Sequence, residues 1–194
     1  RYGARLMVDD AHSVGILAGG RGTAAHFGVT QDVDLIMCTF SKAFASLGGF
    51  IAGAEEIIFY IKHAARSFIF SASMPPSNTA AALAALKIMR EEPDRCDRVI
   101  RNAARVRDGL TSLGFNTGHS ETPIVPVIIG DDMLTLHVWK ALFEAGVFVN
   151  PVLPPAAPLN LSLLRTSYMA THNNAQLDRV IETFAKVGKE MGLI

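Results

Sequence analysis

The chain has 194 residues, of which 49% are hydrophobic and 19% charged, so it can bury a sizeable core and is not typical of a disordered protein. Its 18 basic residues balance 18 acidic ones and form no basic run, which argues against a nucleic-acid partner. No apolar run reaches the roughly 20 residues of a membrane-spanning helix, so we expect no transmembrane segment. Two isolated cysteines, Cys38 and Cys96, indicate a reducing, cytoplasmic setting.

The first half of the chain alternates short apolar runs with polar or glycine-rich turns. Strands of a covered, parallel sheet are predicted at residues 6–8, 34–40 and 50–52. Residues 68–73 predict another extended segment, and the alanine-rich residues 79–90 predict a buried helix. Glu91, Glu92 and Pro93 end this helix, so we place a domain boundary between residues 92 and 93.

The second half shows helical spacing of its apolar residues. Residues 96–113 predict a long amphipathic helix, with Gly114 as its C-terminal cap. Further strands are predicted at residues 124–129, 147–149 and 163–169, and further helices at 133–143 and 177–187. Pro126 predicts an edge position for its strand, because proline has no amide hydrogen to donate. Strands and helices alternate throughout, which is typical of an α/β fold.

Three reactive side chains, those of Asp9, His12 and Lys42, follow predicted strands. Ligands of open α/β sheets bind outside the carboxyl ends of parallel strands. An aldehyde cofactor needs an amine with which to form an imine, and a pyridinium nitrogen needs an acidic partner. Lys42 and Asp9 supply these two groups, and His12 can hydrogen-bond a phenolic oxygen. The hydroxyls of Thr39 and Ser41 stand where a phosphate could bind.

Five motifs resemble, in order and spacing, successive signatures of the α-oxoamine synthases. They are VDDAHSVG at 8–15, GRG at 20–22, TFSK at 39–42, FSASMPP at 70–76 and LRTSYMATH at 164–172. Members of this family are homodimers that depend on pyridoxal 5'-phosphate (PLP) and have the PLP-dependent transferase fold of type I. The resemblance implies that fold here, in its C-terminal half only.

The same resemblance assigns the two expected domains to parts of the family's fold. Residues 1–92 would be the C-terminal part of the large PLP-binding domain with its mostly parallel sheet, and residues 93–194 the small C-terminal α/β domain. The apolar run at residues 6–8 follows the first residues with no opening element, so we expect the sequence to begin within a domain. The family's glycine-rich region and its ring-stacking histidine have no counterpart here. A chain this short is therefore expected to be inactive alone.

The resemblance also implies roles for individual residues. Lys42 would be the Schiff-base lysine, Asp9 the partner of the pyridine nitrogen and His12 the partner of the phenolic oxygen. Thr39 and Ser41 would bind the cofactor phosphate.

Two further roles concern the partner subunit and the substrate. Ser71 would reach the phosphate of the neighbouring subunit's cofactor, so that a homodimer shares its active sites. Arg165 would bind the amino-acid carboxylate through its two-pronged guanidinium. Some members carry an arginine before a pair of prolines, where this chain has Leu153, Pro154 and Pro155. Carboxylate binding therefore rests on Arg165.

The implied reaction condenses an amino acid with an acyl-CoA, both small-molecule substrates. Residues 70–78, 147–158 and 166–172 are most similar to bacterial serine palmitoyltransferases, which indicates L-serine and palmitoyl-CoA as substrates. The products would be 3-ketodihydrosphingosine, CoA and carbon dioxide. Residues 188–194 also resemble 2-amino-3-ketobutyrate CoA ligases, which use glycine and acetyl-CoA. The 8-amino-7-oxononanoate synthase branch, with alanine and a pimeloyl thioester, is a further alternative.

Other readings of these residues stay open. A transaminase of the same fold would use the lysine, the acid and the arginine without an acyl-CoA step. A catalytically silent partner subunit would tend to lose Lys42, which is present. Asp9 and His12 could ligate a metal, but no third ligand stands at a sensible spacing, so we expect no metal. Thr39 could simply end a strand, and Arg165 could pair with an acidic neighbour.

Overall fold

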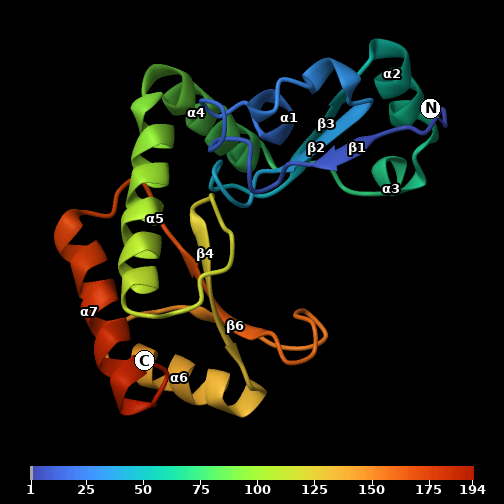
Figure 1. Cartoon of the computed structure of the whole chain (residues 1–194). Helices are drawn as coiled ribbons and strands as arrows, with labels where there is room; N and C mark the ends of the chain where they lie inside the picture. Colours follow the sequence, from blue (N-terminus) through green and yellow to red (C-terminus); the bar gives the residue numbers. More distant parts are fainter. Residues whose placement is uncertain (1) are drawn as a thin grey trace. The chain divides into compact units, whose positions relative to one another are not determined.

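The computed structural model describes residues 2–194, which form two compact units (Figure 1). The first unit ends at Asp97, and the second is Arg98–Ile194. The division falls within helix α5 (Asp94–Ser112), whereas the sequence predicts a domain boundary just before it. No helix of residues 2–194 is long and apolar enough to cross a membrane.

A three-stranded sheet in the order β1-β2-β3 forms the centre of the first unit. Strands β1 (Met7–Asp9) and β2 (Leu35–Thr39) are parallel, with Asp9 opposite Met37. Strand β3 (Gly49–Gly53) runs antiparallel to β2, so the expected parallel arrangement is wrong for this strand. Only residues 40–48 join β2 to β3, whereas a parallel connection needs about a dozen residues or more.

The first unit also contains four complete α-helices in its described residues. They are α1 (Thr23–His26), α2 (Glu55–Ala64), α3 (Arg66–Ile69) and α4 (Pro76–Glu91), with a short 3₁₀ turn at Thr30–Asp32. The predicted helix at 79–90 is confirmed. The predicted extended segment at 68–73 is wrong at its start, because Ile69 N–H bonds to Ala65 O at 3.0 Å and closes a helical turn.

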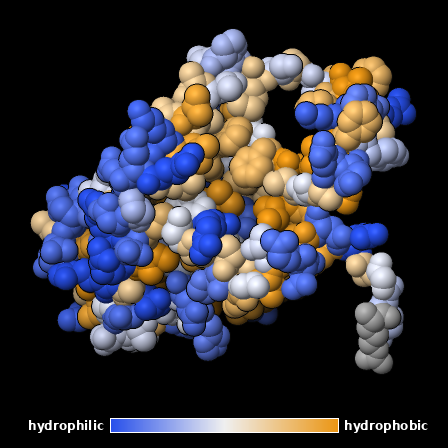
Figure 2. Space-filling model, turned by 90° about the horizontal axis from the view of Figure 1, so that it is seen from above, coloured by the Kyte–Doolittle hydropathy of each residue, from blue (hydrophilic) through white to orange (hydrophobic). Residues whose placement is uncertain are grey.

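The first unit leaves much of its apolar surface exposed. Met7 and Ile51, on the outer strands, are 53% and 40% exposed, and Ala82 is the buried residue of α4. Hydrophobic side chains are visible on the molecular surface in Figure 2. The described residues of this chain therefore do not cover the sheet of the first unit, and they leave most of α4, the helix predicted to be buried, accessible to solvent.

The second unit packs three helices with an antiparallel sheet. Strands β4 (Ile124–Gly130), β5 (Asn150–Val152) and β6 (Ser162–Ser167) have the order β4-β6-β5. Strand β4 lies at an edge, as Pro126 predicts. The helices are α5, α6 (Asp132–Glu144) and α7 (Asn174–Glu190). Gly114 follows α5 with a φ of 102°, which confirms the predicted glycine cap.

Helices α5 and α7 lie close together, because a glycine allows a close approach and a charge pair links them. A Cβ at Gly109 would lie 2.7 Å from Ile181 Cδ1, so the two helices approach closely there. Arg105 donates to Asp178 at 2.6 Å beside this contact. The apolar faces of these helices meet β6 in a core that includes Leu110, Leu164 and Phe184.

Replacing Leu164 by alanine tests this core, since its side chain is fully buried on the central strand. We expect Leu164→Ala to lower the free energy of unfolding by about 2–5 kcal/mol, measured by urea titration. Leu159→Ala is the control, because Leu159 is 80% exposed and its loss should change the free energy of unfolding by less than about 0.5 kcal/mol. Equal effects of the two substitutions would contradict the described core.

Candidate active site

The parallel strands β1 and β2 end at the same edge of their sheet. Asp9 is the last residue of β1, and Thr39 is the last residue of β2. The amide of Asp10 donates to Met37 O at 2.8 Å, so the pairing continues one residue beyond β1. The two loops that leave this edge carry His12 and Lys42, respectively. Four of the predicted site residues are therefore brought to one edge.

Thr39 is the centre of a hydrogen-bonded group at this edge. Its Oγ1 accepts from Ser41 Oγ at 3.3 Å and from Lys42 Nζ at 3.4 Å. The side chains of Ser41 and Lys42 are exposed. An amine and two hydroxyls thus lie within reach of one another and of solvent.

The loop that carries Lys42 is closed at its base. Phe40 N–H donates to Gly48 O at 2.8 Å, and Ser46 N–H donates to Phe40 O at 2.8 Å. Phe44 is buried and meets Phe40 edge-on, with ring centroids 5.2 Å apart. Gly48 has a φ of 111°, and a Cβ there would meet the Met74 sulfur at 2.3 Å. The loop therefore has little freedom at its base.

Charges of both signs surround Cys38, which lies next to Thr39 in β2. Burial raises the pKa of the Cys38 thiol most, and the negative charges of Asp10 and Asp9 raise that pKa further. The positive charge of Lys42 acts in the opposite direction. The carboxylates and the lysine are therefore close enough to influence one buried group. Asp9 Oδ1 itself accepts from Ala11 N–H at 3.0 Å.

Two predicted site residues lie outside this group. The hydroxyl of Ser71, in the segment after α3, donates to Ser67 O. Arg165 belongs to the second unit, where it is half-buried on β6 and stands opposite Pro126 and Asn150. The structure thus brings Asp9, Thr39, Ser41 and Lys42 to one edge of the sheet but not Ser71 or Arg165, and the roles of all predicted site residues stay predictions.

The sequence interpretation missed Asp10, a buried carboxylate that is only 1% exposed. Its two oxygens accept from Thr23 N–H at 2.9 and 3.2 Å. A signal was present in the sequence, because Asp9 and Asp10 are adjacent and only one can face a cofactor. The nearby Gly20 lies in a turn with a φ of 88°, and Gly22, the residue before α1, has a φ of 93°.

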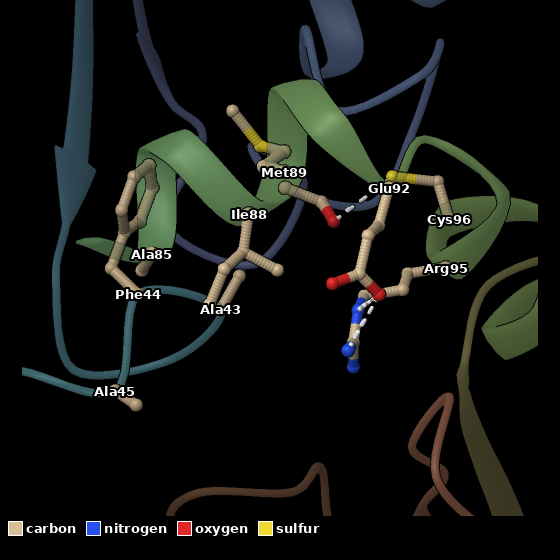
Figure 3. A pocket seen from close by; sticks show the side chains of 10 residues that line it. Ala43, Phe44, Ala45, Ala85, Ile88, Met89, Glu92, Arg95 and Cys96 are labelled. Carbon is tan, nitrogen blue, oxygen red and sulfur yellow. Dashed lines mark hydrogen bonds and ion pairs between the residues drawn. The ribbon is translucent and has the colours of Figure 1, made fainter. Parts of the chain in front are cut away.

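A cavity of about 290 Å³ lies next to the lysine loop (Figure 3). Its walls include Ala43, Phe44 and Met89, and Cys96 Sγ donates to Gly15 O at 3.4 Å at one side. Arg95 pairs with Glu92 at 2.7 Å in the same lining. Lys42 is not one of the lining residues, so this cavity is separate from the group around Thr39.

Residues 1–184 match the family model described as aminotransferase class I and II, so the chain belongs to that family.

Within this family, the chain is similar to curated relatives with two different names. The chain is 50% identical over 190 residues to a serine palmitoyltransferase of Bacteriovorax stolpii, covering 97% of this chain and 45% of the relative. It is 44% identical to an 8-amino-7-oxononanoate synthase of Treponema denticola, covering 100% of this chain and 49% of the relative. The chain therefore spans about half the length of these relatives.

A solved serine palmitoyltransferase with a PLP internal aldimine shares the fold, with a TM-score of 0.94 and 34% identity. The match covers 99% of this chain and 49% of the solved one. The predicted fold class and the resemblance to the α-oxoamine synthases are confirmed by these comparisons.

The electrostatics of the two cysteines can be checked by alkylation. Burial is the main cause that raises the pKa of Cys38 and of Cys96, so less thiolate is present at pH 8 than in an unfolded chain. We expect iodoacetamide to modify both thiols slowly in the native protein and rapidly in urea, as followed by mass spectrometry. Cys38→Ala and Cys96→Ala variants assign the two rates. Rapid native modification would contradict the burial of these thiols.

Proposed function

We propose that this chain is the lysine-bearing half of a PLP-dependent α-oxoamine synthase. The observation that carries the proposal is the group formed by Lys42, Ser41 and Thr39 at the strand edge that also ends in Asp9. The named relatives support it, and each is about twice as long as this chain. The activity is therefore proposed for the longer protein.

The residues at the edge fit PLP in chemical type. The cofactor needs an amine for its aldehyde, a carboxylate for its ring nitrogen and donors for its phosphate, and Lys42, Asp9 and Thr39 supply them. When bound, PLP supplies an aldehyde that takes up an amine and a ring that draws electron density from the α-carbon of the substrate.

Each side chain at the edge has a defined task in this proposal, and Lys42 has two. The amine of Lys42 would hold the cofactor and, once released from it by the amino acid, would accept the proton from the α-carbon. Asp9 keeps a proton on the pyridine nitrogen, because a carboxylate stabilises the cationic ring. His12 donates to the phenolic oxygen, and the hydroxyls of Thr39 and Ser41 donate to the phosphate.

Arg165 is proposed to hold the carboxylate of the amino acid through two parallel N–H bonds. Its strand β6 is the central strand of the second unit, which gives the side chain a rigid base. Leu153, Pro154 and Pro155 offer no second guanidinium in their segment.

L-serine and palmitoyl-CoA are the proposed substrates, with 3-ketodihydrosphingosine, CoA and carbon dioxide as products. Relatives named serine palmitoyltransferase from two organisms, each 50% identical, support this choice. The second candidate is the condensation of alanine with a pimeloyl thioester, favoured by the 44% identical oxononanoate synthase.

A homodimer in the cytoplasm is the proposed setting. Ser71 would contribute to the active site of the partner subunit, and it lies in a segment with exposed aromatic residues. Phe59, Tyr60, Phe68 and Phe70 are each at least 61% exposed, and apolar surface of this kind favours association. The free, buried thiols of Cys38 and Cys96 suit a reducing compartment.

The reaction is tested in the full-length protein that contains this chain, by thiol release from acyl-CoA. We expect release with L-serine and palmitoyl-CoA, and a loss of about 10²–10⁴-fold in Lys42→Ala, because the proton acceptor is removed. Lys62→Ala is the control, since Lys62 is exposed on α2. Faster release with alanine and pimeloyl-CoA would move the assignment to the second candidate, and release unaffected by Lys42→Ala would contradict the mechanism.

The role of Arg165 is tested by Arg165→Lys in the same protein. Lysine keeps the charge but cannot make two parallel bonds, so KM for serine should rise by about 10-fold or more. KM for palmitoyl-CoA should stay unchanged. Arg179→Lys, on the exposed side of α7, is the matched control. Equal changes in both KM values would indicate a structural role for Arg165.

A further inference from the structure

We infer that Asp10 is a positioning residue that holds the loop after β1 and so fixes the place of His12 beside Asp9. The inference rests on the proposed function for its chemical purpose, because His12 and Asp9 are the proposed partners of the cofactor ring. Asp10 does not itself face that ring, since its side chain is 1% exposed.

The backbone of Asp10 fixes the start of the loop. Its N–H donates to Met37 O at 2.8 Å, which ties the residue to the end of β2. Its carbonyl accepts from Ser13 N–H at 3.0 Å and from Val14 N–H at 3.1 Å. His12 lies inside the turn that these bonds close, so the position of its backbone is set by Asp10.

The side chain of Asp10 fixes the end of the same loop. Both carboxylate oxygens accept from Thr23 N–H, at 2.9 and 3.2 Å, where α1 begins. Thr23 Oγ1 in turn donates to Ser13 Oγ at 2.8 Å. One residue therefore clamps both ends of the loop, and the second bond returns to the turn that contains His12.

The space around the carboxylate is filled. A Cβ on Gly22 would lie 2.2 Å from Asp10 Oδ2 and 3.1 Å from Val14 Cγ2, so only glycine fits at this position. Gly22 also has a φ of 93°, a conformation that other residues rarely adopt. A hydrogen bond to a buried carboxylate is stronger than one between neutral groups, so its loss should be felt along the loop.

The clamped loop also contacts the loop that carries the lysine. A Cβ on Gly15 would lie 2.5 Å from Ala43 Cβ, so the two backbones are in close contact next to Lys42. Gly15 N–H bonds to Gly20 O at 2.9 Å, within the same clamped segment. A displaced loop would therefore disturb the lysine side of the site as well as His12.

The first test uses the full-length protein without cofactor and measures hydrogen–deuterium exchange. We expect faster exchange in peptides that cover residues 11–23 for Asp10→Ala, and a smaller increase for Asp10→Asn, whose amide oxygen can still accept from Thr23. Asp34→Asn is the control, because Asp34 accepts from Leu6 N–H at 2.8 Å at the other end of β1. Unchanged exchange at 11–23 in Asp10→Ala would overturn the inference.

If Asp10→Ala does not fold, Ser13→Ala removes the second link of the clamp, and it should still speed exchange at residues 11–23. Unchanged exchange in Ser13→Ala would then count against the clamp.

The second test is PLP binding, followed by the absorption band that depends on Lys42. We expect Asp10→Asn to weaken PLP binding by about 10–100-fold, by analogy with groups that orient metal-binding side chains. Its band should shift in the same direction as that of His12→Ala, and the double variant should be no worse than His12→Ala. Additive losses would overturn the positioning role. Absence of the absorption band in the unsubstituted protein would instead contradict the proposed function. The exchange data would then still show whether Asp10 holds the loop at residues 11–23.

Discussion

The parallel pairing of β1 with β2 is the constraint on which the candidate site depends. With Asp9 opposite Met37, both strands end at one edge, and the loops that leave them start side by side. A register shift of one residue would turn Asp9 to the other face of the sheet and away from Lys42. The amide of Asp10 extends the ladder to Met37 O and thereby supports this register beyond the strand end.

Local features of the fold follow well from the sequence. Pro126 predicts an edge strand because proline has no amide hydrogen to donate, and Gly114 predicts a helix end because glycine adopts a positive φ without steric cost. Orientation and burial follow less well, because they depend on partners far away in the chain. Phe68 and Ile69 favour strands, yet they lie in α3, and β3 reverses direction because its connection to β2 is short.

The chemical types of the side chains predict the candidate site itself. They do not predict the residues that hold its loops in place. Lys42, Thr39 and Ser41 form a hydrogen-bonded group, as expected for residues that act on one ligand. Asp10 looks like Asp9 in the sequence, and its different environment is visible only in the structure, through its burial and its bonds to Thr23. Arg165 lies in the second unit, so its part in the reaction depends on how the complete protein is assembled.

The most direct test of the account is to identify the lysine that PLP modifies. The full-length protein is incubated with PLP, reduced with borohydride, digested and analysed by mass spectrometry. The account predicts a phosphopyridoxyl group on the peptide that contains Lys42, at near-stoichiometric yield, and none on the Lys62 peptide. A label at another lysine, or no label in a protein that is shown to be folded, would contradict it.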